Sequence, residues 1–162
     1  MTDLQLRDPV HRVSTKAPVL WVCLALGQAI IGAVVLWLVT GRWNWFSMPW
    51  WVWVLYVVVA LTYLVLMPMI RYRVHRWEST ETAVFIQTGW LTLERRIAPM
   101  SRVQTVDFEQ GAISRIVGLA SVTVTTASAA GPLKIHGLDK DVAQRLVDEL
   151  TRRTQAEPGD AT

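Results

Sequence analysis

The most regular feature of the chain is an apolar stretch that runs from residue 17 to residue 70 and contains one charged residue, Arg42. About 25 uncharged residues separate Lys16 from Arg42, and about 28 separate Arg42 from Arg71. A helix needs roughly 20 apolar residues to cross the hydrocarbon core of a bilayer. The pattern therefore predicts a transmembrane hairpin over residues 17–70, with helices at about 18–39 and 49–69. The alternative is a pair of buried helices in a soluble all-α protein, but 162 residues are too few to enclose them.

After residue 70 the apolar positions recur at every second residue, which is typical of half-buried β-strands. Val84 and Ile86 alternate in this way, and so do Val122 and Val124. Gly89 interrupts the first alternation and predicts a hairpin turn there. Further alternating positions fall at Leu91, Leu93, Gln104, Val106, Phe108, Thr126, Leu133 and Ile135. The region predicts several short antiparallel strands.

Two helices are predicted among and after these strands. A short one covers residues 111–117 and ends at Gly118, which suits the left-handed residue that follows many helices. A longer one covers residues 139–153, with Asp139 as the N-cap. Its apolar residues fall on one face at helical spacing and would cover the open end of the sheet; they are Val142, Leu146, Val147 and Leu150.

The polar ends of the chain complete the predicted organisation. Residues 1–16 are expected to form a disordered cytoplasmic lead, residues 71–153 a cytoplasmic domain, and residues 154–162 a flexible tail. Basic residues flank both helices, with Arg7, Arg12 and Lys16 before the first, whereas the loop between the helices contains only Arg42. Because cytoplasmic loops are enriched in Lys and Arg, both termini are predicted to be cytoplasmic.

The net charge of +3 does not indicate a nucleic-acid partner. Four of the 16 basic residues and two of the 13 acidic residues precede residue 71, which leaves 12 basic and 11 acidic residues in the soluble part. A nucleic-acid-binding domain concentrates basic charge on its folded surface. No nucleic-acid partner is therefore expected.

The loop between the two helices and the helix ends beside it are dense in tryptophan. Indole has an apolar body and one N–H donor, so it is enriched at membrane interfaces. We interpret these residues as interfacial anchors, and a docking surface for another membrane protein is the alternative. They are Trp37, Trp43, Trp45, Trp50, Trp51 and Trp53.

A family resemblance is carried by the segment RRIAPMSRVQTVDFEQG (residues 95–111), by IVGL at the end of the short helix, and by the strand VTVTTA. These motifs and the preceding hairpin resemble the bacterial pleckstrin-homology-like (PH-like) membrane proteins with two transmembrane helices. The resemblance implies two packed antiparallel sheets, partly rolled, that a C-terminal helix closes. It also implies the bacterial inner membrane. It supplies no activity, because the family has no settled function and a fold does not determine one.

The sequence contains no pattern that predicts catalysis. The three histidines, His11, His75 and His136, lack the spacing of metal ligands, and no cofactor-binding glycine motif occurs. Glu78 and Glu81 are close in sequence but are expected in an exposed turn. We therefore expect a non-enzymatic protein without a cofactor or metal.

Two binding functions remain, and an enzyme of unknown class is a remote third. The domain is expected to be an interaction module or accessory subunit that assembles with another membrane protein or with itself. Alternatively, it senses anionic phospholipid at the inner membrane surface, where each basic residue contributes on the order of 1 kcal/mol. The candidate arginines for a headgroup or partner surface are Arg71, Arg73, Arg76, Arg95, Arg96 and Arg102.

Overall fold

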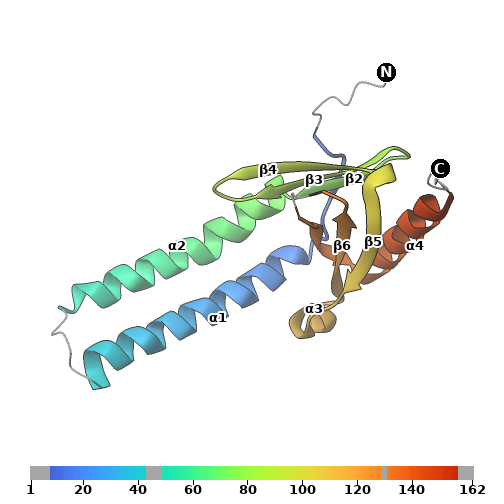
Figure 1. The fold of residues 1–162 in the computed structure, drawn as a ribbon. Coiled ribbons are helices and arrows are strands. Elements are labelled where there is room, and N and C mark those ends of the chain that lie inside the picture. The colour runs from blue at the N-terminus through green and yellow to red at the C-terminus, as the bar shows by residue number, and fades with distance from the viewer. Residues whose placement is uncertain (1–7, 43–48, 129–130, 157–162) are drawn as a thin grey trace.

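Two long helices run side by side away from a small β domain in the computed structural model, which describes residues 8–42, 49–128 and 131–156 (Figure 1). Helix α1 covers Ala17–Trp37 and continues as a π-helical segment, η1, over Leu38–Arg42; helix α2 covers Trp51–Val74. Both are long and apolar enough to cross a membrane. Most of their side chains are exposed, as expected where lipid surrounds a helix.

The second helix extends beyond its predicted end at residue 69. It continues to Val74, so that Arg71 and Arg73 lie in its last turn instead of beginning the domain. The 20 residues from Trp51 to Arg71 span about 30 Å at 1.5 Å per residue, the thickness of a hydrocarbon core. Arg71 therefore lies one bilayer core away from the tryptophans at the opposite end of the helix.

Within the described residues, seven strands form two antiparallel sheets, as predicted for a PH-like domain, and these sheets do not close into a barrel. The first sheet has the order β1 (His11–Arg12), β2 (Arg76–Ser79), β3 (Ala83–Gly89) and β4 (Leu93–Pro99). The second has the order β5 (Val103–Glu109), β6 (Leu119–Thr126) and β7 (Leu133–Asp139). A 3₁₀ turn over Met100–Arg102 (η2) connects β4 to β5.

The core lies between the sheets and beneath helix α4 (Lys140–Ala156). Val84 and Ile86 contribute from β3, and Ile135 contributes from β7. Leu146 and Leu150 bury the predicted apolar stripe of α4 against them. The helix closes the end of the domain far from the hairpin, whereas the end beside the hairpin stays open (Figure 1).

Helix α3 (Ala112–Val117) lies beside α1 and confirms the predicted short helix. Gly118 follows it with φ of 76°, the left-handed conformation that favours glycine. The backbone N–H of Gly118 donates a hydrogen bond to the carbonyl of Arg115 at 3.3 Å. The tight turn sends the chain directly into β6.

The segment before the hairpin is part of the domain, which corrects the prediction of a disordered lead for residues 8–16. Strand β1 pairs with β2, with His11 opposite Trp77. Val13 and Ser14 are buried, and the Ser14 N–H donates to the Gly137 carbonyl at 2.8 Å. Without β1, the outer edge of β2 would present a row of unpaired backbone N–H and C=O groups, and β1 pairs with them. Residues 1–7 lie outside the described part of the chain.

Two further differences concern polar residues. Glu78 was expected in an exposed turn, but it lies in β2 with 8% of its surface exposed and accepts the Val10 backbone N–H at 3.3 Å. Helix α4 continues through residues 154–156, which were expected to begin a flexible tail. Residues 157–162 lie outside the described ranges.

Candidate functional site: a cavity where the hairpin meets the domain

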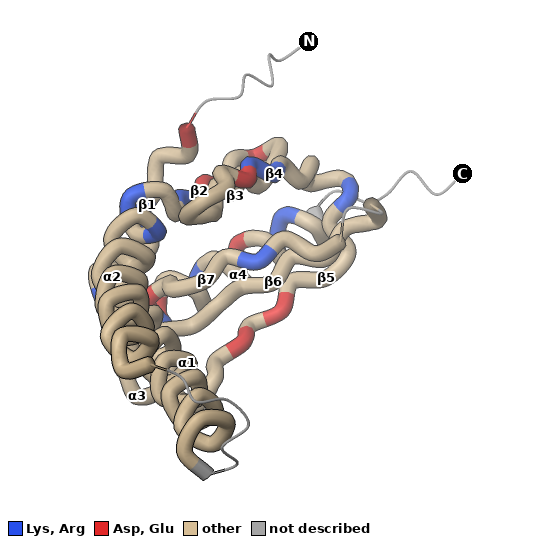
Figure 2. The backbone as a smooth tube through the Cα atoms, turned by 90° about the vertical axis from the view of Figure 1, so that its left-hand side faces the viewer, with Lys and Arg blue, Asp and Glu red and all other residues tan. Residues whose placement is uncertain are grey.

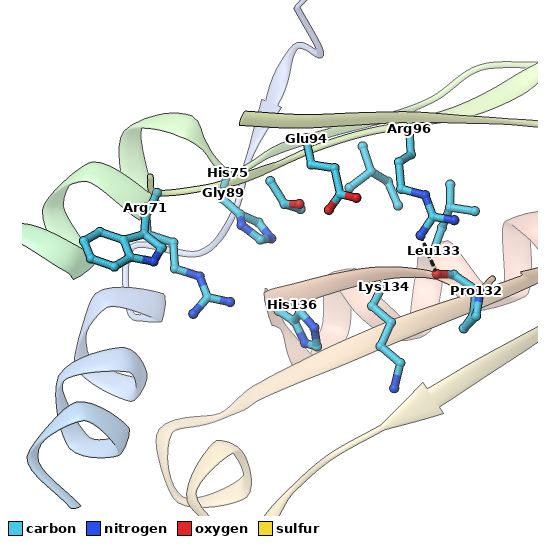
Figure 3. Close-up of a pocket in the computed structure, with 12 residues that line it drawn as sticks. Arg71, His75, Gly89, Glu94, Arg96, Pro132, Leu133, Lys134 and His136 are labelled. Carbon is cyan, nitrogen blue, oxygen red and sulfur yellow. Dashed lines mark hydrogen bonds between the residues drawn. The ribbon is translucent and has the colours of Figure 1, made fainter. Parts of the chain in front are cut away.

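The open end of the domain contains a cavity of about 380 Å³ between the two sheets, next to the last turn of α2 (Figure 3). Arg71 and His75 enter it from the end of α2, Glu94 and Arg96 from β4, and His136 from β7. Figure 2 shows that charged residues are almost confined to the domain and the adjacent ends of the hairpin. The cavity therefore places ionisable groups at the boundary between the membrane helices and the sheets.

Arg71 is a half-buried cation of this site. Its guanidinium carbon lies 4.6 Å from the centroid of the Trp21 ring, in a cation–π contact between the two helices. Within the described ranges, no carboxylate forms an ion pair with it. The guanidinium points toward His136 across the cavity (Figure 3). Arg71 therefore retains hydrogen-bond donors for an anion.

His75 is buried with 1% of its surface exposed, and its ring points into the cavity (Figure 3). Neither ring nitrogen has a hydrogen-bond partner among the described residues. Burial, with smaller contributions from the charges of Arg71 and His136, lowers the pKa of His75 from 6.5 to about 3. The imidazole is therefore neutral near pH 7 and holds one N–H donor without a partner.

His136 lies on the opposite wall, on β7. Its Nδ1 is 3.1 Å from the Ser121 hydroxyl, a contact that leaves Nε2 for another partner. Burial and the charges of Arg71 and Lys134 lower the pKa of His136, and Glu109 opposes them. Lys134 forms an ion pair with Glu109 at 3.6 Å, and its ammonium points away from the cavity interior (Figure 3).

A second cavity of about 470 Å³ shares Arg71 and His136 with the first. Its other walls include Leu20 and Leu24 of α1 and Ile113 of α3. The first cavity is thus lined largely by polar groups beside Arg71, and the second adds apolar side chains of α1 and α3. The two cavities together form an amphipathic site where the hairpin meets the domain.

The six arginines predicted as one surface lie in different places. Arg71 and Arg96 line the first cavity, and Arg96 donates to the carbonyls of Gly131 and Pro132 at 2.9 Å each. Arg95 points to the other face of β4, where it pairs with Asp8 and donates to Gln87 Oε1 at 2.9 Å.

The remaining three arginines lie away from the first cavity. Arg73 is exposed beside an apolar groove between the helices, Arg76 lies in β2 opposite Arg12, and Arg102 is exposed in the turn η2. Sequence reasoning missed His75, Glu94 and His136 as site residues, because nothing local in the sequence brings β4, β7 and α2 together.

The tryptophans of the opposite end are largely exposed where the structure describes them. Trp37 ends α1, and Trp50 and Trp51 begin α2 with their rings on the surface. Trp53 is partly buried. Trp43 and Trp45 lie outside the described residues. The interpretation of these rings as interfacial anchors stays a prediction.

Among the described residues, no cluster of three or more His, Cys, Asp or Glu side chains could hold a metal ion. Most ionisable groups of the cavity are instead hydrogen-bond donors, namely the guanidiniums of Arg71 and Arg96, the Lys134 ammonium and two neutral imidazoles, beside one carboxylate, Glu94. That set suits hydrogen bonding to an anion.

Comparisons with known proteins agree with this architecture. A family model described as "Bacterial PH domain" matches residues 17–154. The chain is 32% identical over 155 residues to the UPF0699 transmembrane protein YdbS of Bacillus subtilis, an alignment that covers 90% of this chain and 92% of the relative. No solved structure matches the chain. With two membrane-spanning helices, two antiparallel sheets and a closing helix, the chain belongs to the bacterial PH domain family of membrane proteins.

Proposed function

We propose that this protein is a membrane-anchored, non-catalytic module whose PH-like domain binds the anionic headgroup of a phospholipid. The observation that carries the proposal is the position of Arg71. Its guanidinium is half-buried between two cavities, one polar and one apolar, without a carboxylate partner among the described residues. A charge withdrawn from water is costly unless an opposite charge or hydrogen-bond acceptors compensate it. Phosphate oxygens satisfy both requirements, because guanidinium binds them in a bidentate manner.

The depth of Arg71 supports a lipid as the source of the phosphate. The residue lies about 30 Å along α2 from Trp51, which places it near the phosphate layer when Trp51 lies at the opposite interface. The apolar cavity beside it, with Leu20 and Leu24, faces the region that an acyl chain occupies. A phospholipid would thus place its phosphate on Arg71 and one acyl chain between α1 and α3.

The two histidines extend this site without adding charge. A neutral imidazole offers one N–H donor, and His75 and His136 both line the cavity that Arg71 enters. Glu94 on the same cavity can accept a hydrogen bond from a headgroup hydroxyl. A glycerol headgroup behind a phosphodiester therefore fits the set of donors and acceptors.

The test compares two arginines of the same helical turn. Full-length protein in a neutral detergent is titrated with phosphatidylglycerol, and bound lipid is counted by native mass spectrometry. Arg71→Gln is expected to weaken binding roughly tenfold to a hundredfold, because a hydrogen bond to a charged group contributes about 1.5–3 kcal/mol. Arg73→Gln removes the same charge outside both cavities and is expected to bind like the wild type.

Two outcomes would overturn the proposal. If both variants bind phosphatidylglycerol equally, Arg71 does not hold the headgroup. If soluble glycerol 3-phosphate binds as tightly as the lipid, the acyl contact is wrong and the ligand is a soluble phosphate ester.

We also propose that the domain and both termini lie at the cytoplasmic face of the bacterial inner membrane. The segment before α1 and the chain after α2 form one folded unit, so both must lie on the same side of the bilayer. Arg12 and Lys16 precede α1, and Arg71 and Arg73 end α2, as the positive-inside bias requires for the cytoplasmic side. Digestion of the domain by protease added outside intact spheroplasts would refute this orientation.

Assembly with a membrane partner or with a second copy is the other candidate, and the edge of β5 favours it. This strand is the outer member of its sheet, and Thr105, Asp107 and Glu109 are exposed along it. An outer strand offers backbone donors and acceptors to an extended partner segment. A photocrosslinker at residue 105, activated in membranes, would give a discrete protein adduct. Recovery of uncrosslinked protein only would refute this candidate.

A further inference from the structure

Two apolar protrusions of the domain lie on either side of the membrane hairpin. The first, which we call the β3–β4 tip, comprises Trp90, Leu91 and Leu93 at the connection between these strands. The second, which we call the α3 ridge, comprises Ile113 and Ile116. All five side chains are exposed, Leu91 by 80% and Ile116 by 86%. In Figure 1 the tip lies beside α2 and the ridge lies beside α1.

The β3–β4 tip reaches a part of α2 that lies within the membrane. The Trp90 ring packs edge-on against Tyr63, with ring centroids 5.5 Å apart and an interplanar angle of 79°. Tyr63 precedes Arg71 by eight residues, which is about 12 Å along the helix axis. A side chain that contacts Tyr63 therefore lies deeper in the bilayer than the guanidinium at the end of the helix.

The α3 ridge approaches the other helix in the same way. Ile113 shares a cavity with Leu20 and Leu24 of α1. Leu24 lies seven residues after the first residue of α1, about 10 Å along its axis. Ile116 projects from the same short helix into open space, and the neighbouring Arg115 is also exposed. A long basic side chain at this place can extend to the phosphates while the isoleucines contact acyl chains.

We propose that the β3–β4 tip and the α3 ridge are buried in one leaflet of the bilayer, so that the domain is partly sunk in the membrane instead of standing clear of it. Lipid is the occupant because both protrusions adjoin the apolar hairpin, Trp90 through its contact with Tyr63 and Ile113 through the cavity that it shares with Leu24. The alternative, exposure to water, would leave large apolar side chains hydrated next to hydrocarbon. Burial of apolar side chains at the boundary of headgroups and acyl chains is the usual way in which a peripheral surface binds a membrane.

The experiment measures depth at three positions of the full-length protein in liposomes of phosphatidylethanolamine and phosphatidylglycerol. Cys23 is first replaced by serine, because it is an exposed free cysteine. Single cysteines are then introduced as L91C, I116C and T151C, and each carries a nitroxide. Relaxation by oxygen, which concentrates in the bilayer, is compared with relaxation by a water-soluble nickel chelate. Thr151 is the control, because it is exposed on α4.

The expected result is an oxygen-to-nickel ratio severalfold higher at L91C and at I116C than at T151C. A ratio equal to that of T151C at either position would overturn the proposal, which requires both protrusions to insert. Low accessibility to both reagents would also overturn it, because protein would then cover the surface. The measurement does not depend on headgroup binding, so it remains informative if Arg71 does not bind lipid.

Discussion

The neutral, buried imidazole of His75 predicts an acid sensitivity that one substitution should remove. Its pKa is about 3 in the folded protein against 6.5 ordinarily, chiefly because burial disfavours the charged ring. Between pH 6.5 and pH 3, His75 is therefore protonated in the unfolded chain and neutral in the folded chain. Stability is unaffected above pH 6.5 and falls as the pH is lowered from 6.5 toward 3. The slope is about 1.36 kcal/mol per pH unit, so His75 costs about 2 kcal/mol at pH 5.

The assay is reversible unfolding of the full-length protein in a neutral detergent at pH 7.5 and pH 5. The variant is His75→Leu, which removes the titrating group together with two ring nitrogens that have no partner among the described residues. The wild type is expected to lose about 2 kcal/mol more than the variant between these pH values. The lowered pKa of His136 also reduces stability in acid, but it does so in both proteins and therefore cancels in the comparison.

Equal losses in the wild type and in His75→Leu would refute the reasoning. That result would mean that His75 is hydrated or paired in the folded protein, and that burial does not keep it neutral. At pH 7.5 the variant is expected to be at least as stable as the wild type, because the removed ring nitrogens make no hydrogen bond among the described residues.

Two further predictions concern how the hairpin is attached to the sheet. Gly137→Ala should destabilise the domain by about 1–3 kcal/mol, because φ is +76° and the new Cβ would lie 2.7 Å from the Cβ of Ala17 in α1. Gly131→Ala is the matched control. Gly131 has the same φ with open space around it, so this substitution should cost less stability. Similar midpoints of unfolding for the two alanine variants would contradict this. Ser14→Ala should cost about 0.5–1.5 kcal/mol, because it removes a 2.8 Å hydrogen bond to Asp139. The same loss measured in an Asp139→Ala background, which has no side-chain acceptor at this position, would show that the Asp139 carboxylate is not the partner responsible.

The sequence predicted those parts of the fold that local patterns determine. Two uninterrupted apolar runs gave the hairpin, and the spacing of Leu146 and Leu150 gave α4, because both signals repeat over several helical turns. The resemblance then identified the two-sheet architecture. β1 was missed because two residues are too few to show an alternation, and its partner strand lies beyond the hairpin.

The cavity could not be predicted for a similar reason. In the sequence, Arg71 is one of six candidate arginines, and nothing local distinguishes it, since a basic residue at the end of a membrane helix is usual. Its contact with Trp21 joins residues 50 positions apart, and His136 comes from another strand again. A basic residue acquires a specific role here through burial and through neighbours that only the folded chain supplies. Arg95, which was a candidate on the same grounds, forms a surface ion pair with Asp8 instead.

The pairing of His11 with Trp77 sets an order of events during synthesis. The ribosome must add 66 more residues, including both membrane helices, before the partner of the first strand exists. At roughly 5–20 residues per second this takes several seconds. During that interval the N-terminal segment must stay on its own side of the membrane while two helices insert after it. A nascent chain whose first helix inserts in the reverse orientation would leave β1 on the wrong side of the bilayer and could not complete the domain.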